Sequence, residues 1–331
     1  MRSSGAGVDA TEMTERSTHS MFRNLFGVLL ALGLGAAWAA PARAEKPLKV
    51  VATLSTFSDL VKTIGGDRVE ASHVASPRFN PHFIEPRPSD VLKVKKADLF
   101  IHAGLDLELW RWPLVDAAGN PAVRPGGERE LDLSRGVSLL GVPIGSVSRA
   151  EGDIHLYGNP HYWAGPQNGP ILARSIAGKL SQIDPAHAAD YQRRLDDFLK
   201  ELEQARQRWA RAAAGGRGME VICYHDAWPY LEAFLGLKTE LFLEPKPGIP
   251  PTPQQILRAE GRIREQGVRA ILQAGYDPPA AAEALRRKTG VRVVTLCQNV
   301  GEKPECGDYL GMMDHNVREI LSALEGRSPD E

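Results

Sequence analysis

Short apolar runs alternate with helically spaced apolar residues along most of the chain. The run at residues 49–54 predicts a buried strand, and the apolar spacing over 58–64 predicts a helix that Gly65 and Gly66 end. The same succession of strand and helix returns after residue 215. This rhythm is typical of parallel α/β sheets. Further strands are expected at 69–74, 97–102, 220–224, 239–243, 270–273 and 291–296, and further helices at 91–96, 170–183, 227–235, 254–266, 279–289 and 309–324.

Residues 185–214 are the longest periodic stretch, with apolar side chains three or four positions apart from Tyr191 to Trp209. Thirty helical residues at about 1.5 Å each reach roughly 45 Å, which is longer than one small domain is wide. Residues 113–150 are rich in Gly and Pro and are expected to be mostly loop. The pattern therefore predicts an α/β fold of two Rossmann-like lobes joined by one long rigid helix, with a first lobe at 45–184, the helix at 185–215 and a second lobe at 216–331.

The N-terminal residues do not belong to this pattern. Arg23 is followed by an apolar run from 25 to 40, and the segment ends in small residues at Ala44. A positive start, a short apolar core and a small-residue end are typical of a cleavable secretory signal. The alternative, a transmembrane anchor, needs a longer apolar run. We therefore expect residues 1–44 to be removed by cleavage near Ala44, with Met21 as a candidate true start, and the product to be periplasmic.

Composition and charge narrow the class of protein. Lys and Arg number 40 against 41 Asp and Glu, which gives a formal net charge of −1. This balance lacks the basic footprint of a nucleic-acid-binding protein. Export permits a disulfide. Cys297 and Cys306 are close in sequence and flank a loop containing Gly and Pro, so they are the expected pair, while Cys223 lies in an apolar run and is expected to be a buried thiol.

Three histidines stand where a parallel α/β fold binds ligands. His82 and His225 follow predicted strands, and His161 follows Asn-Pro just before a helix. Ligands bind beyond the carboxyl ends of strands in open α/β sheets. Three neutral imidazoles that converge between two lobes suit a divalent ion, most naturally zinc. A single loop histidine is more often only hydrated or hydrogen-bonded. His155 remains open between transient metal capture and a plain loop residue.

The order of motifs resembles the periplasmic zinc- or manganese-binding component of bacterial ABC importers. The resemblance covers nearly all of the chain after residue 44, and it implies two α/β lobes bridged by a long helix with the metal in the cleft between them. It places His82, His161 and His225 at the first three metal ligands of that family, with histidine at the third position as in zinc-type members. The matching stretches are Asn80-Pro81-His82, Glu85-Pro86, Pro88-Ser89-Asp90, Ala97-Asp98-Leu99, Gly158-Asn159-Pro160-His161-Tyr162-Trp163, Tyr224-His225-Asp226-Ala227-Trp228-Pro229-Tyr230-Leu231 and Tyr309-Leu310-Gly311-Met312-Met313-Asp314-His315-Asn316.

The fourth ligand departs from the family pattern. Members usually place an Asp just after the last strand, but residues 296–301 contain no acid here. Glu244 ends a predicted strand and is the favoured substitute. Cys297, Asp277 or a water molecule are the alternatives, and a disulfide would remove Cys297 from consideration. The expected metal ligands are therefore His82, His161, His225 and Glu244.

The resemblance implies high-affinity capture of a divalent transition metal, Zn²⁺ most naturally and Mn²⁺ as the alternative within the same family. It implies delivery to an ABC permease in the inner membrane, a periplasmic zinc chaperone as a further candidate partner, a monomer and no enzymatic activity. The competing interpretation is a zinc-dependent hydrolase with a three-histidine site. Such an enzyme needs a general base beside the metal-bound water, and no motif in the sequence supplies one.

Overall fold

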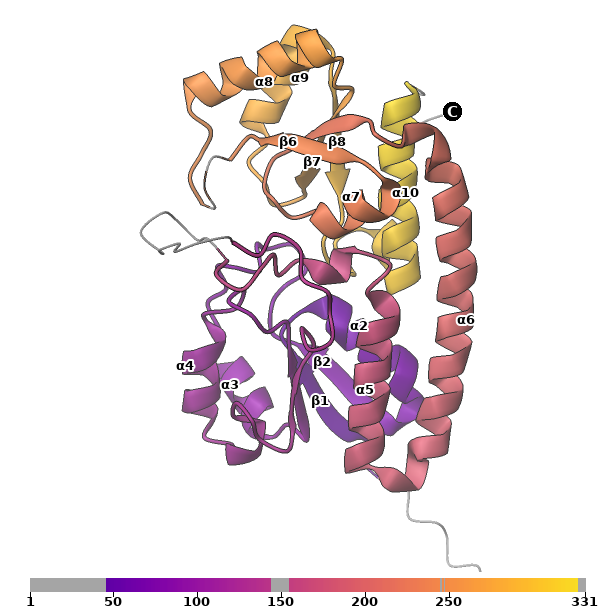
Figure 1. The fold of residues 1–331 in the computed structure, drawn as a ribbon. Helices are drawn as coiled ribbons and strands as arrows, with labels where there is room; N and C mark the ends of the chain where they lie inside the picture. The colour runs from indigo at the N-terminus through magenta and orange to yellow at the C-terminus, as the bar shows by residue number, and fades with distance from the viewer. Residues whose placement is uncertain (1–45, 144–154, 245, 247, 327–331) are drawn as a thin grey trace, which may run out of the picture. The chain divides into compact units, whose positions relative to one another are not determined.

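A four-stranded parallel sheet forms the first lobe. The computed structural model describes residues 46–143, 155–244, 246 and 248–326 (Figure 1). The strand order is β2-β1-β3-β4, so the apolar β1 lies in the interior of the sheet between β2 and β3. The strands are β1 (Leu48–Ala52), β2 (Val69–His73), β3 (Leu99–His102) and β4 (Glu130–Asp132), and the helices are α2 (Ser55–Gly65), α3 (Pro88–Lys95), α4 (Arg111–Ala118) and α5 (Gly169–Ile183).

The second lobe repeats the topology of the first. Its strand order is β6-β5-β7-β8, again parallel, with Cys223 of β5 in register with Phe242 on one side and Leu272 on the other. The prediction of two parallel α/β lobes is confirmed. The strands are β5 (Glu220–Cys223), β6 (Lys238–Phe242), β7 (Ala270–Ala274) and β8 (Arg292–Leu296), and the helices are α7 (Pro229–Leu235), α8 (Pro253–Gln266), α9 (Ala280–Thr289) and α10 (Tyr309–Glu325).

One long helix, α6 (Ala188–Ala212), connects the lobes, with a short 3₁₀ turn at each end. Its buried residues recur at three and four positions from Tyr191 to Trp209, as the sequence pattern predicts. The helix packs against α2 and α5 of the first lobe and against α7 and α10 of the second (Figure 1). At its C-terminal end, the Trp209 indole Nε1 donates to Asp314 Oδ1 on α10 at 2.9 Å. The connecting helix is therefore anchored to both lobes.

The two lobes share one hydrophobic core. A single buried apolar cluster includes Phe57 on α2, Trp163 in the segment before α5 and Met312 on α10, whereas a second, smaller cluster belongs to the second lobe alone. Opening a wide hinge between the lobes would expose this shared core to water, at about 25 cal/mol for each Å² of apolar surface. Small tilts and loop movements are therefore the expected motions.

Residues 113–143 are mostly loop, as predicted, but they also contain two short elements that the sequence pattern did not indicate. Helix α4 runs into this stretch and β4 adds a fourth strand to the first sheet. Leu114, Val115 and Ala118 bury the inner face of α4, and Gly119 ends it in the left-handed conformation with φ 63°. An eight-residue helix and a three-residue edge strand are too short to show a clear apolar period among the surrounding Gly and Pro residues, so the sequence pattern did not indicate either element. Residues 144–150 lie outside the described part of the chain.

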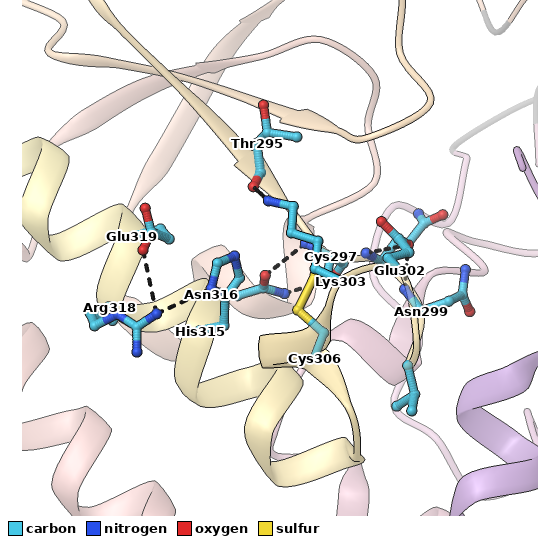
Figure 2. The surroundings of a disulfide bond; sticks show 12 residues. Thr295, Cys297, Asn299, Glu302, Lys303, Cys306, His315, Asn316, Arg318 and Glu319 are labelled. Carbon is cyan, nitrogen blue, oxygen red and sulfur yellow. Dashed lines mark hydrogen bonds and ion pairs between the residues drawn. A yellow bond between two sulfur atoms is a disulfide. The ribbon is translucent and has the colours of Figure 1, made fainter. Parts of the chain in front are cut away.

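The loop after β8 holds the two lobes together. Cys297 and Cys306 form a disulfide that closes this loop, as the sequence predicts (Figure 2). Between them, Val300 N donates to Thr56 Oγ1 of the first lobe at 3.0 Å, and Ser55 Oγ donates to Val300 O at 2.7 Å. A covalently closed loop thus supplies hydrogen bonds across the lobe interface.

Residues 47–331 form one compact unit, distinct from residues 1–46. The predicted signal peptide at 1–44, its cleavage near Ala44 and the candidate start at Met21 lie outside the described residues. The boundaries at 184/185 and 215/216 stay predictions. Across the described ranges, none of the helices combines the length and apolar character that crossing a bilayer requires.

Candidate metal centre

The ends of parallel strands carry two of the predicted site residues. His225 follows β5, and Glu244 follows the neighbouring β6, where its backbone N–H donates to Tyr224 O at 2.8 Å. Because parallel strands end at the same edge of a sheet, the two side chains meet there. Glu244 Oε2 lies 2.7 Å from His225 Nδ1. His225 therefore directs its other nitrogen, Nε2, away from the carboxylate, and this atom is buried without a hydrogen-bond partner.

His82 is positioned by a turn after β2. Its backbone N–H donates to Asn80 Oδ1 at 3.0 Å, which closes a local turn around Pro81. The Trp110 indole donates to Pro81 O at 2.8 Å and ties this turn to the body of the first lobe. The His82 side chain is 8% exposed. The Asn-Pro-His sequence thus builds a rigid turn that presents an imidazole to His225 of the second lobe.

His161 is fully buried and is oriented by Asn159. The backbone N–H and the Nδ1 of His161 both lie 3.0 Å from Asn159 Oδ1. An amide oxygen only accepts, so Nδ1 carries the proton and Nε2 presents its lone pair. Asn159 Nδ2 in turn donates to Asp226 O at 2.7 Å, beside His225 in the second lobe. One asparagine therefore sets the His161 tautomer and connects its turn to the partner lobe.

His155 reaches the same place. Its Nδ1 lies 2.9 Å from Asp106 Oδ1, while Asp106 Oδ2 accepts the backbone N–H of Leu156 at 2.9 Å. The Nε2 atom of His155 is buried without a hydrogen-bond partner. Asp106 follows β3, 49 residues earlier in the chain. The carboxylate therefore orients His155 in the way that carboxylates orient metal-binding histidines.

Four imidazoles converge between the two lobes. One nitrogen from each of His82, His155, His161 and His225 lies within 4.8 Å of the other three. The Nε2 atoms of His82 and His161 are 3.0 Å apart, and the rings of His82 and His225 are 5.4 Å apart between centroids. A tetrahedral zinc ion with bonds of 2.0–2.1 Å needs nitrogens about 3.4 Å apart. Shifts of about 1 Å therefore suffice to make this cluster a tetrahedral nitrogen site.

The alternatives for the fourth ligand occupy other positions. Glu244 stands behind His225, with its second oxygen accepting the Gly248 N–H at 2.6 Å. Asp277 Oδ2 accepts the backbone N–H of Ala274 at 2.7 Å, and Cys297 is in a disulfide. The structure thus brings together His82, His161 and His225 as predicted and adds His155. Ligation by Glu244 stays a prediction.

Burial and neighbouring charges set different pKa values within the cluster. Burial and the three surrounding histidines hold the pKa of His161 well below its ordinary value. Burial also disfavours the charged form of His225, but the hydrogen bond and charge of Glu244 outweigh it and raise the pKa of His225. His161 is therefore neutral and ready to bind a cation, whereas His225 is the first of these two rings to take up a proton as the pH falls.

Sequence reasoning did not identify Asp106 and Asn159 as the residues that orient His155 and His161. For Asp226 the sequence offers a role in orienting the imidazoles and favours a helix N-cap, but α7 begins at Pro229 after Trp228, and Asp226 instead contributes its carbonyl to Asn159. Asp106 lies far from His155 in the chain, so no local pattern connects them. Asn159 had a usable signal, since its position two residues before His161 matches that of Asn80 before His82.

Known proteins share this fold over most of the chain. The family described as zinc-uptake complex component A, periplasmic, matches residues 50–323. The manganese ABC transporter substrate-binding lipoprotein PsaA of Streptococcus anginosus is 25% identical over 311 residues, which is 91% of this chain and 96% of that protein. The iron-binding protein YfeA of Yersinia pestis is 26% identical over 295 residues, which is 86% of this chain and 88% of that protein.

Solved structures agree on the architecture. A crystal structure of ZnuA superposes with a TM-score of 0.71 at 20% identity and covers 84% of this chain and 100% of the other. FpvC from Pseudomonas aeruginosa, in complex with Mn²⁺, superposes with a TM-score of 0.72 at 24% identity, covering 85% of this chain and 99% of the other. At these identities the likeness establishes the shared fold.

Two parallel-sheet lobes, a connecting helix and a buried imidazole cluster define a metal-binding substrate-binding protein of an ABC importer. The chain belongs to the family of the periplasmic zinc-uptake complex component A. Proteins of this class bind a divalent metal outside the inner membrane and work with a permease and an ATPase rather than as enzymes. The predicted class, location and permease partner are thereby confirmed.

Replacing Glu244 with glutamine is expected to shift metal release to lower pH. Only the neutral imidazole binds a metal, so affinity falls as the pH drops through the pKa of His225. Glu244→Gln removes the charge that raises this pKa, and proton competition then starts at a more acidic pH. At pH 8 the variant should bind about 10- to 100-fold more weakly, the usual cost of losing an orienting carboxylate. Competition titrations from pH 5 to 8 measure both effects, and an unchanged profile would contradict the assignment.

Proposed function

We propose that this protein captures zinc in the periplasm through His82, His155, His161 and His225 and delivers it to an ABC permease. The observation that carries the proposal is the convergence of one nitrogen from each imidazole within 4.8 Å. Oxygen atoms hold the Nδ1 of His155, His161 and His225, which leaves Nε2 of each ring for the metal. This division between the two nitrogens is the usual arrangement of metal-binding histidines.

An all-nitrogen site favours zinc over manganese. Imidazole suits zinc, copper, iron and nickel, whereas Mn²⁺ prefers carboxylate, carbonyl and water oxygens. The carboxylates nearest the cluster, Asp106 and Glu244, accept hydrogen bonds from the imidazoles and from backbone N–H groups. Zinc sites with four protein ligands have binding free energies on the order of 10–16 kcal/mol at neutral pH. The donor set therefore supports tight capture of zinc.

The same geometry argues against a zinc hydrolase. Catalytic zinc sites have three protein ligands and keep a position open for water. Four imidazoles would occupy all four positions of a tetrahedral zinc ion and leave none for water. Three of these histidines come from the first lobe, and His225 comes from the second. Asp106 and Glu244 each accept two hydrogen bonds, so neither is placed as a general base. A binding role therefore fits the cluster better than turnover.

Delivery requires that one ligand leave the metal. Because the lobes share a core, a local movement at the cleft is a more accessible route than wide opening. His155 is the natural first ligand to leave, since it is partly exposed whereas His82, His161 and His225 are buried. A zinc chaperone as donor and a monomeric state remain predictions.

Competition titration of the metal-free protein tests the choice of metal. Zinc should displace manganese with an affinity at least roughly 100-fold higher, as expected for nitrogen donors. One equivalent of zinc should bind, without hydrolysis of ester or peptide substrates. Equal affinity for the two metals would overturn the assignment to zinc.

Replacing His155 with alanine tests the fourth ligand. If four imidazoles share the metal, losing one of them costs roughly a quarter of the binding free energy, or about 100- to 1,000-fold in affinity. His187→Ala removes a histidine outside the cluster, where His187 pairs with Asp184, and should leave affinity unchanged. An unchanged affinity in His155→Ala would instead favour Glu244, Asp277 or water as the fourth ligand.

A further inference from the structure

A second group of side chains that can hold a metal ion lies at the end of the second lobe's last strand. Cys297 follows β8, Cys306 closes the loop, and His315 lies on α10. One ligand atom from each lies within 4.8 Å of the other two, and all three residues are buried (Figure 2). None of the three belongs to the four-histidine cluster. In the described chain these are thus two separate groups of donors.

His315 has an unsatisfied atom in this group. His315 is only 7% exposed, and its Nε2 is buried without a hydrogen-bond partner. Leaving a buried polar atom unpaired costs about 1–3 kcal/mol. A buried nitrogen without a partner, in a residue grouped with two cysteines, is an unused ligand position.

The other nitrogen of His315 contacts the Arg318 guanidinium. Arg318 lies 3.2 Å from Nδ1 and, because a guanidinium only donates, this contact favours a proton on Nε2. Metal binding at Nε2 therefore requires the proton to move to Nδ1 and Arg318 to turn away. The Arg318 side chain is 57% exposed, and its Nη2 already lies 3.5 Å from Glu319 Oε1 (Figure 2). After turning away from His315, the guanidinium can therefore donate its hydrogen bonds to Glu319 and to water.

We propose that reduction of the Cys297–Cys306 disulfide creates a second site for a soft divalent metal, with Cys297, Cys306 and His315 as ligands. A small dithiol supplies two electrons and two protons: the disulfide becomes two thiols, and the dithiol becomes a cyclic disulfide. The metal then replaces the proton of each thiol, forms two metal–sulfur bonds and one metal–nitrogen bond, and releases two protons. Water completes the coordination.

The backbone around the pair suits this exchange. The Cα atoms of Cys297 and Cys306 are 6.7 Å apart, near the upper end of the range for disulfides. Zinc–sulfur bonds of 2.3 Å in a tetrahedron hold sulfurs about 3.8 Å apart, which this separation accommodates. Asn316 clamps Cys297 with its side chain, accepting from Cys297 N at 2.8 Å and donating to Cys297 O at 2.7 Å. Gly301 N donates to Cys306 O at 2.7 Å, so both cysteines retain backbone anchors after reduction.

The two sites differ in their donors, and cobalt distinguishes them. Co²⁺ bound by thiolates shows a sulfur-to-metal charge-transfer band in the near ultraviolet, which a histidine-only site lacks. We would titrate Co²⁺ into full-length Cys223→Ser protein reduced with a water-soluble phosphine. Cys223 is a buried thiol hydrogen-bonded to Glu232, and serine retains a donor there. The expected result is a second bound equivalent together with the charge-transfer band.

Matched variants separate the proposal from general effects of reduction. The oxidised protein and the reduced Cys297→Ser/Cys306→Ser variant should bind one equivalent without the band. Reduced His315→Ala should bind the second equivalent on the order of 100-fold more weakly, and His315→Gln checks whether packing alone explains that loss. Retention of the first equivalent reports that the reduced protein stays folded. Absence of the band in reduced, folded protein, or its survival unchanged in both His315 variants, would overturn the proposal without affecting the four-histidine site.

Discussion

Replacing His161 with alanine is expected to lower the affinity for zinc by roughly 100- to 1,000-fold. A site of this kind binds zinc with on the order of 10–16 kcal/mol from four ligands, so one ligand accounts for about 2.5–4 kcal/mol. Each 1.4 kcal/mol is a factor of ten in affinity. His161 is fully buried among the other three imidazoles, so its loss removes a ligand from the middle of the cluster. Competition titration with a chelator of known affinity measures the change.

The control for His161→Ala is a histidine outside the cluster that is also buried. His102 is a suitable control because it is outside both groups of possible metal ligands among the described residues. Its Nε2 instead lies 2.7 Å from Glu130 Oε1 in the first lobe. His102→Gln should leave zinc affinity within about twofold, even where it alters stability, because it removes no ligand. Should His161→Ala retain the affinity of the unaltered protein, the cluster would not be the binding site, and the proposed function would lose its main support.

The architecture was predictable because most of its elements leave a clear apolar pattern in the sequence. Residues 49–54 and 270–273 are short apolar runs between turn signals, and the stripe from Tyr191 to Trp209 has a helical period over several turns. Helix α4 and strand β4 escaped prediction because tertiary packing, rather than a sustained local pattern, determines such short elements. The limit therefore lies in how clearly the apolar pattern of each element stands out from the Gly- and Pro-rich sequence around it.

The candidate site was predictable in part for a related reason. His82 and His225 follow strands, so the topology alone brings them to the cleft. His155 has no such marker, and its place in the cluster depends on Asp106, which only the folded chain brings near it. Glu244 was expected beside the metal because it ends a strand. Its contact with His225 Nδ1 depends on how one imidazole ring turns, which no spacing of residues determines.

Replacing Trp163 with alanine is expected to lower the free energy of unfolding by about 3–5 kcal/mol, the usual cost of deleting a buried indole. Trp163 has no exposed surface, and its ring lies 5.7 Å from that of Phe57 on α2. Its Nε1 also donates to Gln298 O at 2.8 Å, in the disulfide-closed loop of the second lobe. The substitution therefore removes both packing and a hydrogen bond at the lobe interface. Urea unfolding of the metal-free protein measures the loss.

Two further substitutions identify what Trp163 contributes. Trp163→Phe keeps an aromatic ring but removes the indole N–H that donates to Gln298 O. This substitution should therefore lower the free energy of unfolding by about 1–3 kcal/mol. Trp112 is 46% exposed and lies under the Arg111 guanidinium, so Trp112→Ala should lower the free energy of unfolding by less than about 1 kcal/mol. Trp163 also lies 5.6 Å from the His161 ring, so its removal should weaken zinc binding, whereas Trp112→Ala should not. A similar loss of stability in both alanine variants would contradict the shared core, and with it the reason for expecting metal release by local movement rather than wide opening of the lobes.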